Sequence, residues 1–273
     1  MAQVHVPPPS GSKKAFRLVP LQYPIRSLLV RWQASILSAL GIAMTIAVLC
    51  GVFALRSGFQ SLHASTGADS VAVYLRAGAT SEGESGISLE SVNTYKVRPE
   101  IALDDKGQPL AAGETYLALF LNKADGGGLV NVPIRGVEPA SFAIHGEQFK
   151  LLPGGRLFNF GADEIIVGKP TSERIRDCHL GDTLIINVTP FKVVGIFEYE
   201  GAYRSEIWGD VDRIAAALER PMRQRVVAKL KPGTDVAELK EQIEGDKRLP
   251  SKLMTERGYF AAQTNVLLSL IHI

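Results

Sequence analysis

The fold of this chain is decided by residues 36–55, which read ILSALGIAMTIAVLCGVFAL. They lie in a stretch with no charged side chain, bounded by Arg31 and Arg56. A helix of about twenty residues rises roughly 1.5 Å per residue and so crosses a hydrocarbon core of about 30 Å. A cleaved signal peptide has a shorter apolar core, of about 7–15 residues, behind a brief leader. Because this run is longer and follows thirty-five residues, the sequence predicts a transmembrane helix over residues 36–55.

Basic residues gather on one side of this helix. The 273-residue chain has 30 basic and 28 acidic residues, a net charge of +2, and its 46% hydrophobic content excludes a disordered chain. Residues 1–35 contain five basic residues and no acidic residue, so residues 36–273 carry a net charge of −3. Loops rich in Lys and Arg stay in the cytoplasm. We therefore predict a cytoplasmic N-terminus and an exported domain beyond Leu55.

The predicted cytoplasmic tail, residues 1–35, contains a second apolar pattern. Four apolar residues recur at helical spacing: Ile25, Leu28, Leu29 and Trp32. We interpret this interfacial face as one side of an amphipathic helix that lies on the inner leaflet, with Trp32 among the lipid headgroups. The alternative is that the membrane helix continues into water without a break.

Small residues recur at every fourth position of the predicted membrane helix. They are Ser35, Ala39, Ala43, Ala47 and Gly51. Small side chains let a neighbouring helix backbone approach closely, and dispersion contacts then hold the two helices together in lipid. We predict that this helix-packing ridge contacts a partner helix, which argues against a lone anchor.

The residues after Arg56 alternate between strand and helix patterns. Short apolar or alternating runs predict strands at residues 71–75, 116–121, 130–137, 164–167, 183–188, 191–199 and 225–230. Helices are predicted at residues 170–177, 210–219 and 234–244, the last with Thr234 as its N-cap. This succession indicates an α+β fold, with one N-terminal transmembrane helix followed by a mixed α/β periplasmic core domain.

The exported domain offers little catalytic chemistry. Val167–Thr171 ends like a phosphate loop, but Pro170 stands where a magnesium-binding Ser or Thr belongs, so we reject a nucleotide site. Cys178 and His179 are neighbours in sequence, and neighbouring side chains point in different directions, which disfavours a nucleophile–base pair. The five histidines have no metal-ligand spacing. We assign no catalytic residue, no cofactor and no metal ligand.

A basic cluster lies in the last quarter of the chain. It consists of Arg220, Arg223, Arg225, Lys229 and Lys231. We interpret it as a strand that exposes alternate charges, because the surrounding region is acidic enough to argue against nucleic acid as a partner.

Several short motifs follow one another in an order that resembles a known family. The segment LQYPIRSLLVRW at 21–32 leads into the membrane helix. The exported part then contains GGRLF at 154–158, DEIIVG at 163–168, LGDTL at 180–184, FKVVGIF at 191–197, WGD at 208–210 and KPGTDV at 231–236. This order, over roughly residues 20–268, resembles the MacB/FtsX-like family of ABC transporter permeases, from the first membrane segment through the periplasmic core domain.

The resemblance implies a permease subunit of the bacterial inner membrane that forms a homodimer or heterodimer. In that family, the exported domains transmit the motion caused by ATP binding and hydrolysis to a periplasmic substrate or partner. It also implies a separate cytoplasmic ABC ATPase, because this chain has no fused ATPase domain ahead of its first helix. A periplasmic adaptor is a further candidate partner, and the subunit itself is expected to be non-catalytic.

The resemblance also suggests the limits of the domains. Residues 56–265 correspond to the periplasmic core domain and its stalk, and Val266–Leu268 to the start of a second membrane helix. Such permeases have three further membrane helices after the periplasmic domain, whereas SLIHI at 269–273 resembles a translated sequencing adapter. We expect a truncated gene model, in which residues 266–273 combine the start of a lost second helix with a non-native tail.

Two other classes of protein stay open. A single-span, membrane-anchored periplasmic binding or adaptor protein explains one membrane helix without catalysis, but gives no reason for the helix-packing ridge. An anchored periplasmic enzyme that uses Cys178 and His179 predicts that Cys178→Ser abolishes activity. In a permease the same substitution is nearly silent.

Overall fold

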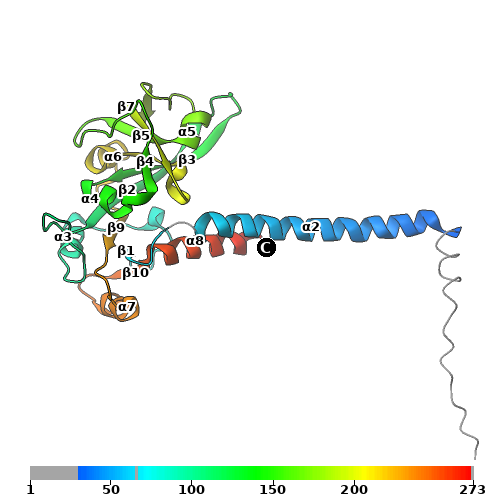
Figure 1. Ribbon diagram of the computed structural model, residues 1–273, viewed down its shortest axis with the longest axis horizontal. Coiled ribbons are helices and arrows are strands. Elements are labelled where there is room, and N and C mark those ends of the chain that lie inside the picture. The colour runs from blue at the N-terminus through cyan, green and yellow to red at the C-terminus, as the bar shows by residue number, and fades with distance from the viewer. Residues whose placement is uncertain (1–29, 65–66, 272–273) are drawn as a thin grey trace, which may run out of the picture. The chain divides into compact units, whose positions relative to one another are not determined.

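The computed structural model describes residues 30–64 and 67–271 (Figure 1). It divides into two compact units, with the boundary between Leu55 and Arg56. Of the predicted interfacial face, Ile25, Leu28 and Leu29 lie outside the described residues. The fourth member, Trp32, is the first residue of helix α2 (Trp32–Ala64).

The first unit, Met1–Leu55, contains the apolar part of helix α2. Its segment Trp32–Leu55 is the one helix, within the described residues, that is long and apolar enough to cross a membrane. Large apolar side chains such as Leu37, Ile42 and Phe53 are exposed along it. A helix with apolar side chains all around is stable in lipid or among other helices. The predicted N-terminal apolar helix is therefore confirmed.

The second unit contains a small antiparallel sheet. Its strands lie in the order β10 (Ser251–Thr255), β1 (Val71–Arg76), β9 (Arg225–Lys229) and the first residues of β2 (Ala111–Asn122). Helices α3 (Leu89–Lys96) and α7 (Val236–Gly245) bury apolar side chains against one of its faces. After β10 the chain enters helix α8 (Glu256–Ile271).

A larger mixed sheet continues from the remainder of β2. Its order is β2, β3 (Leu129–Val137), β8 (Ile207–Asp210), β5 (Glu164–Gly168), β7 (Thr189–Tyr199) and β4 (Phe149–Leu151), and β6 (Thr183–Ile186) also pairs with β7. The pairs β3–β8 and β5–β7 are parallel. The connections contain α4 (Pro139–His145), α5 (Lys169–Arg174), α6 (Val211–Ala217) and the short 3₁₀ helices η1 (Glu82–Glu84), η2 (Gly146–Gln148) and η3 (Ala202–Ser205).

Side chains on the two faces of the small sheet belong to two different apolar clusters. In β1, Val71, Val73 and Leu75 face a central cluster, while Ala72 and Tyr74 face the cluster beneath α3 and α7. All five are at most 3% exposed, so β1 is covered on both faces. The central cluster also collects side chains of the larger sheet and of α8, among them Phe197, Tyr199, Trp208 and Phe260. One core therefore joins the two sheets.

The mixed sheet and its helices confirm the predicted α+β fold. One detail of the prediction is wrong, because Asp235 and not Thr234 is the N-cap of α7. The Asp235 carboxylate accepts hydrogen bonds from the backbone N–H groups of Ala237 and Glu238. The Thr234 hydroxyl instead donates to the carbonyl of Lys231 and closes the preceding turn.

Gly168, which ends β5, explains the motif that ends like a phosphate loop. A Cβ atom at this position would lie 2.1 Å from the carbonyl oxygen of Arg204 and 3.2 Å from that of Glu206. The Gly168 N–H also donates to the Glu206 carbonyl at 2.9 Å. The glycine is therefore required for close backbone packing against the segment that leads into β8.

Gly168→Ala is expected to lower the free energy of unfolding by about 1–3 kcal/mol, because backbone atoms must move to admit the methyl group. Gly245→Ala is the control, since a Cβ there meets nothing within 4 Å, and alanine suits a helix better than glycine. Chemical denaturation of the detergent-solubilised chain, followed by tryptophan fluorescence, measures both variants. Equal unfolding midpoints for the two variants would contradict this explanation.

Candidate functional site: a buried arginine–glutamate network

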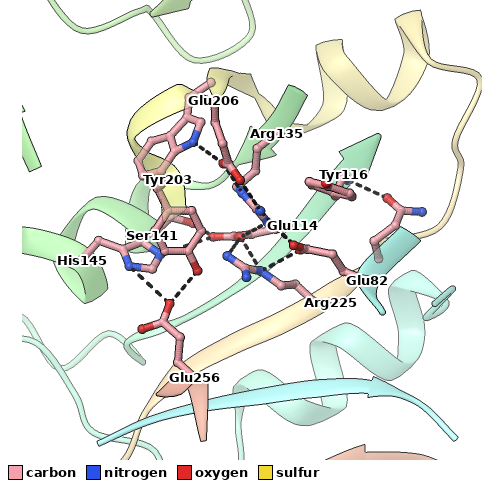
Figure 2. A network of polar contacts seen from close by, with 12 residues as sticks. Glu82, Glu114, Tyr116, Arg135, Ser141, His145, Tyr203, Glu206, Arg225 and Glu256 are labelled. Carbon is pink, nitrogen blue, oxygen red and sulfur yellow. Dashed lines mark hydrogen bonds and ion pairs between the residues drawn. The ribbon is translucent and has the colours of Figure 1, made fainter. Parts of the chain in front are cut away.

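Strand β2 changes its pairing partner in mid-length, and charged side chains gather at this point (Figure 2). Its residues up to Glu114 pair with β9, and those from Thr115 onward pair with β3. Glu114 lies opposite Arg225 of β9, and Tyr116 lies opposite Arg135 of β3. Opposite residues on neighbouring strands bring their side chains into contact. The junction of the two sheets therefore places two arginines beside one glutamate.

Arg135 is 1% exposed and contacts three carboxylates. Its Nε and Nη2 atoms donate to the two oxygens of Glu206 at 2.7 and 2.8 Å. Its Nη1 and Nη2 atoms donate to the two oxygens of Glu82 at 2.7 and 3.0 Å. Nη1 also donates to Glu114 at 3.1 Å. Bidentate, charge-assisted pairs of this kind are among the strongest hydrogen bonds in proteins.

Arg225 is fully buried and shares the Glu114 carboxylate with Arg135. Its Nε donates to Glu114 Oε2 at 2.8 Å, and its Nη2 lies 2.6 Å from the same oxygen. The other oxygen of Glu114 accepts a hydrogen bond from the Ser141 hydroxyl at 2.8 Å. Both guanidinium groups also lie over the Tyr203 ring, at 5.1 and 5.3 Å from its centroid, which is a favourable cation–π geometry.

The pairing determines the ionisation of these groups. Burial by itself raises the pKa of Glu114, but Arg225 and Arg135 outweigh burial and bring this pKa to about 2. Arg135 and Arg225 likewise overcome burial and lower the pKa of Glu82. Burial raises the pKa of the Tyr203 hydroxyl well above its ordinary value. These groups keep one protonation state near neutral pH, which favours a structural role over acid–base catalysis.

The first turn of α8 is bound into the same network. Glu256, which is 2% exposed, accepts hydrogen bonds from the Tyr203 hydroxyl at 2.6 Å and from the backbone N–H of Ala68 at 3.2 Å. One turn later, the Tyr259 hydroxyl accepts a hydrogen bond from the backbone N–H of Glu82 at 3.2 Å. Ala68 belongs to the segment between α2 and β1. The network therefore joins this segment and the start of α8 to both sheets.

The residues singled out in the sequence lie away from this network. Cys178 is fully buried, and burial together with Asp177 raises the pKa of its thiol to about 12. His179 is exposed, and its Nδ1 lies 3.4 Å from the carboxylate of Asp182. Over the part of the chain that the structure describes, no group of three or more potential ligands could hold a metal ion. A thiol that stays protonated and buried disfavours the anchored-enzyme alternative.

The helix-packing ridge lies along α2, where Ala39, Ala43, Ala47 and Gly51 are exposed and Ser35 is half-buried. Its contact with a partner helix stays a prediction.

The buried network was not predicted from the sequence. The interpretation of the basic cluster as exposed alternate charges is wrong for Arg223 and Arg225, which are 5% and 0% exposed. The reason for Arg225 is that the sheet is packed on both faces at the start of β9, where Val227 belongs to the central cluster and Val226 and Ala228 belong to the cluster beneath α3 and α7.

One signal could have pointed to the network. Arg135 stands inside the predicted strand 130–137, between apolar residues. A charged residue in a covered strand must be paired, because an unpaired charge is rarely buried. The same reasoning applies to Arg225 in the predicted strand 225–230, but not to Glu114, which precedes the predicted strand 116–121. It predicts that such residues have partners, although not which ones.

The family model of the MacB-like periplasmic core domain matches residues 35–246. The chain belongs to this family. The resemblance inferred from the order of the sequence motifs is thereby confirmed, and the chain carries a MacB-like periplasmic domain of the ABC transporter permease family. Among curated proteins, no sequence matches this chain.

Some solved structures resemble this MacB-like domain at low sequence identity. The extracellular domain of the noncanonic ABC-type transporter YknZ from Gram-positive bacteria is 11% identical, with 68% of this chain and 100% of the solved chain covered and a TM-score of 0.50. The periplasmic region of MacB from Actinobacillus actinomycetemcomitans is 14% identical, with 74% and 92% covered and a TM-score of 0.48. Likeness at such identity concerns the fold alone.

Glu114→Gln removes the carboxylate that both buried arginines share. We expect a loss of about 3–5 kcal/mol in the free energy of unfolding at pH 7, because breaking a buried pair leaves charge uncompensated. The matched control is Glu198→Gln, which breaks the exposed pair with Lys169 and is expected to leave the denaturation midpoint unchanged.

The effect of Glu114→Gln should also depend on pH. The pKa of Glu114 is about 2 in the folded chain, below the ordinary value of 4.5. Its contribution to stability is therefore complete above about pH 4.5 and is lost as the pH falls toward 2. Denaturation curves between pH 7 and 3 should show that the difference in free energy of unfolding between Glu114→Gln and the wild type becomes smaller as the pH falls. A difference that stays constant argues against this assignment.

Proposed function

We propose that this chain is a permease subunit of an ABC transporter, driven by a separate cytoplasmic ATPase. ATP binding and hydrolysis in the partner move the membrane helices, and the exported domain transmits that motion for export or for mechanical work in the periplasm. The observation that carries the proposal is the buried network, through which the start of α8 and the segment after α2 are joined to both sheets. The subunit itself is non-catalytic.

Transmission begins at α8. A displacement of α8 moves Glu256, and Glu256 is hydrogen-bonded to Tyr203 of η3, directly before β8. The Tyr203 ring lies against both guanidinium groups, and these bind carboxylates from η1, from β2 and from Glu206, which lies between η3 and β8. Removing one partner from a buried ion pair costs several kcal/mol. A force on α8 is therefore passed to both sheets before these pairs separate.

The membrane arrangement completes the proposal. Residues 1–35 form the cytoplasmic tail, with its interfacial face on membrane lipid, residues 36–55 span the inner membrane, and residues 56–265 form the periplasmic domain and stalk. The helix-packing ridge contacts a helix of a second permease subunit, identical or related. A periplasmic adaptor is a further partner of the exported domain. The preference of apolar side chains for lipid and of small side chains for close helix packing supports these assignments.

Cysteine labelling tests the orientation. In a chain with Cys50→Ala, a membrane-impermeant maleimide added to intact spheroplasts should label Lys106→Cys, because Lys106 lies in an exposed turn of the exported domain. Gln33→Cys, which precedes most of the apolar span, should react only after lysis. Buried Cys178 stays unlabelled in both cases. If Gln33→Cys is labelled in intact spheroplasts and Lys106→Cys is not, a cytoplasmic N-terminus is contradicted.

Purification from the native cell tests the function. An N-terminally tagged chain in mild detergent should bring with it an ABC ATPase, and ATP hydrolysis by the complex should be lost when the phosphate-loop lysine of that ATPase is changed. The chain separated from this partner should hydrolyse no ATP. A tagged chain without an ATPase supports the anchored adaptor instead. Loss of activity in Cys178→Ser supports the anchored enzyme.

A further inference from the structure

His145, the last residue of α4, lies at the edge of the buried network (Figure 2). It is 5% exposed. Its Nδ1 lies 3.3 Å from the Tyr199 hydroxyl and 3.8 Å from an oxygen of Glu256. Its Nε2 lies 3.9 Å from an oxygen of Glu114 and has no hydrogen-bond partner. Each ring nitrogen therefore faces a carboxylate just beyond hydrogen-bond distance.

Charged and titratable groups face His145 from every element packed against it. They are Glu114 of β2, Glu256 of α8, Tyr199 of β7, Tyr203 of η3, Arg225 of β9 and Arg135 of β3. Within the network, four carboxylates (Glu82, Glu114, Glu206 and Glu256) accompany two guanidinium groups. The network has an excess of negative charge. A proton on His145 reduces this excess.

A cleft gives water access to this position. It has a volume of about 380 Å³, and His145, Tyr199 and Glu256 line it together with the exposed residues Ser70 and Lys229. Protons can therefore exchange between solvent and the imidazole without unfolding of the domain. The cleft also provides room for a small movement of the imidazole or of the start of α8.

We propose that His145 is an acid-sensitive switch that exchanges the Tyr199 hydroxyl for the Glu256 carboxylate when the imidazole takes up a proton. In the neutral form, Nε2 carries the hydrogen, and Nδ1 accepts a hydrogen bond from Tyr199. A proton taken from water binds Nδ1 and converts it into a donor, which cannot accept from the tyrosine. Nδ1–H then donates to Glu256, and Nε2–H donates to Glu114.

The exchange changes what α4 is bound to. In the neutral form, His145 connects α4 to β7 through Tyr199. In the protonated form, it connects α4 and β2 to the first residue of α8. Acid therefore binds the base of α8 more firmly to the sheets. This inference concerns the exported domain alone and does not depend on the nature of the ATPase.

The pH window follows from the surroundings of the ring. Burial lowers the pKa of His145 below its ordinary value of 6.5, while Glu256 and Glu114 oppose burial and the two arginines add to it. The imidazole is therefore neutral at pH 7 and is protonated in acid. Because the folded pKa lies below the unfolded one, the folded state loses stability as the pH falls below about 6.5.

Nitrogen-15 NMR of histidine-labelled full chain in lipid nanodiscs tests the proposal between pH 7.5 and 4.5, with His145→Gln to assign the signals. The Nδ1 resonance should change from acceptor to protonated type in one step. Glu256→Gln should lower the midpoint of the His145 titration by about one pH unit, which corresponds to a tenfold weaker proton affinity of the imidazole. Tyr199→Phe should raise this midpoint, because the neutral imidazole loses the hydrogen bond that the Tyr199 hydroxyl donates to it. Glu198→Gln, on an exposed carboxylate of β7, should leave it unchanged.

The opposite signs distinguish a switch from a merely structural histidine. A midpoint that moves in the same direction in Glu256→Gln and Tyr199→Phe overturns the proposal, as does an Nδ1 resonance that stays constant over the whole range. The indole N–H signal of buried Trp208 reports folding in each variant. If Glu256→Gln does not fold, Glu256→Asp takes its place, because the shorter carboxylate should also lower the midpoint.

Discussion

The burial of two guanidinium groups at one point of the sheet is the constraint on which the rest of this domain depends. An unpaired charge at such a depth costs several kcal/mol, so Arg135 and Arg225 require carboxylates that are equally buried. Glu114 meets this requirement because β2 crosses from one sheet to the other beside both arginines. Glu82 and Glu206 come from segments that flank the sheets. The pairing therefore holds the two sheets at a defined place.

Aromatic side chains make this pairing effective. Trp208 donates from its indole nitrogen to Glu206 at 2.7 Å, and the Tyr203 ring covers both guanidinium groups. Exclusion of water lowers the local dielectric constant, which strengthens each ion pair and raises the cost of any unmatched charge. Burial of the imidazole likewise disfavours a proton on His145, in spite of its two carboxylate neighbours. Rigidity of the network and sensitivity to acid thus have one physical origin.

Sequence reasoning succeeded where a structure depends on neighbours in the chain. The apolar helix, the strand runs and the order of the motifs are local patterns, and each survives in the structure. The N-cap of α7 was predicted one residue too early. The Asp235 carboxylate reaches the free N–H groups of the helix, whereas the Thr234 hydroxyl binds the carbonyl of Lys231. The burial of Arg225 was not predicted because strand alternation predicts one buried and one exposed face, whereas both faces of the sheet are covered at residues 225–228 of β9.

The sequence by itself determined that the chain has an apolar helix long enough to span a membrane, a basic tail before it and an α+β domain after it, because these features are patterns of residues close together in the chain. It could not determine the network. Arg135 and Glu206 are 71 residues apart, and Arg225 and Glu114 are 111 residues apart. Only the folded sheets bring them together. Which carboxylate pairs with which guanidinium group was decided by strand order and register, and by the requirement that every buried charge has a partner.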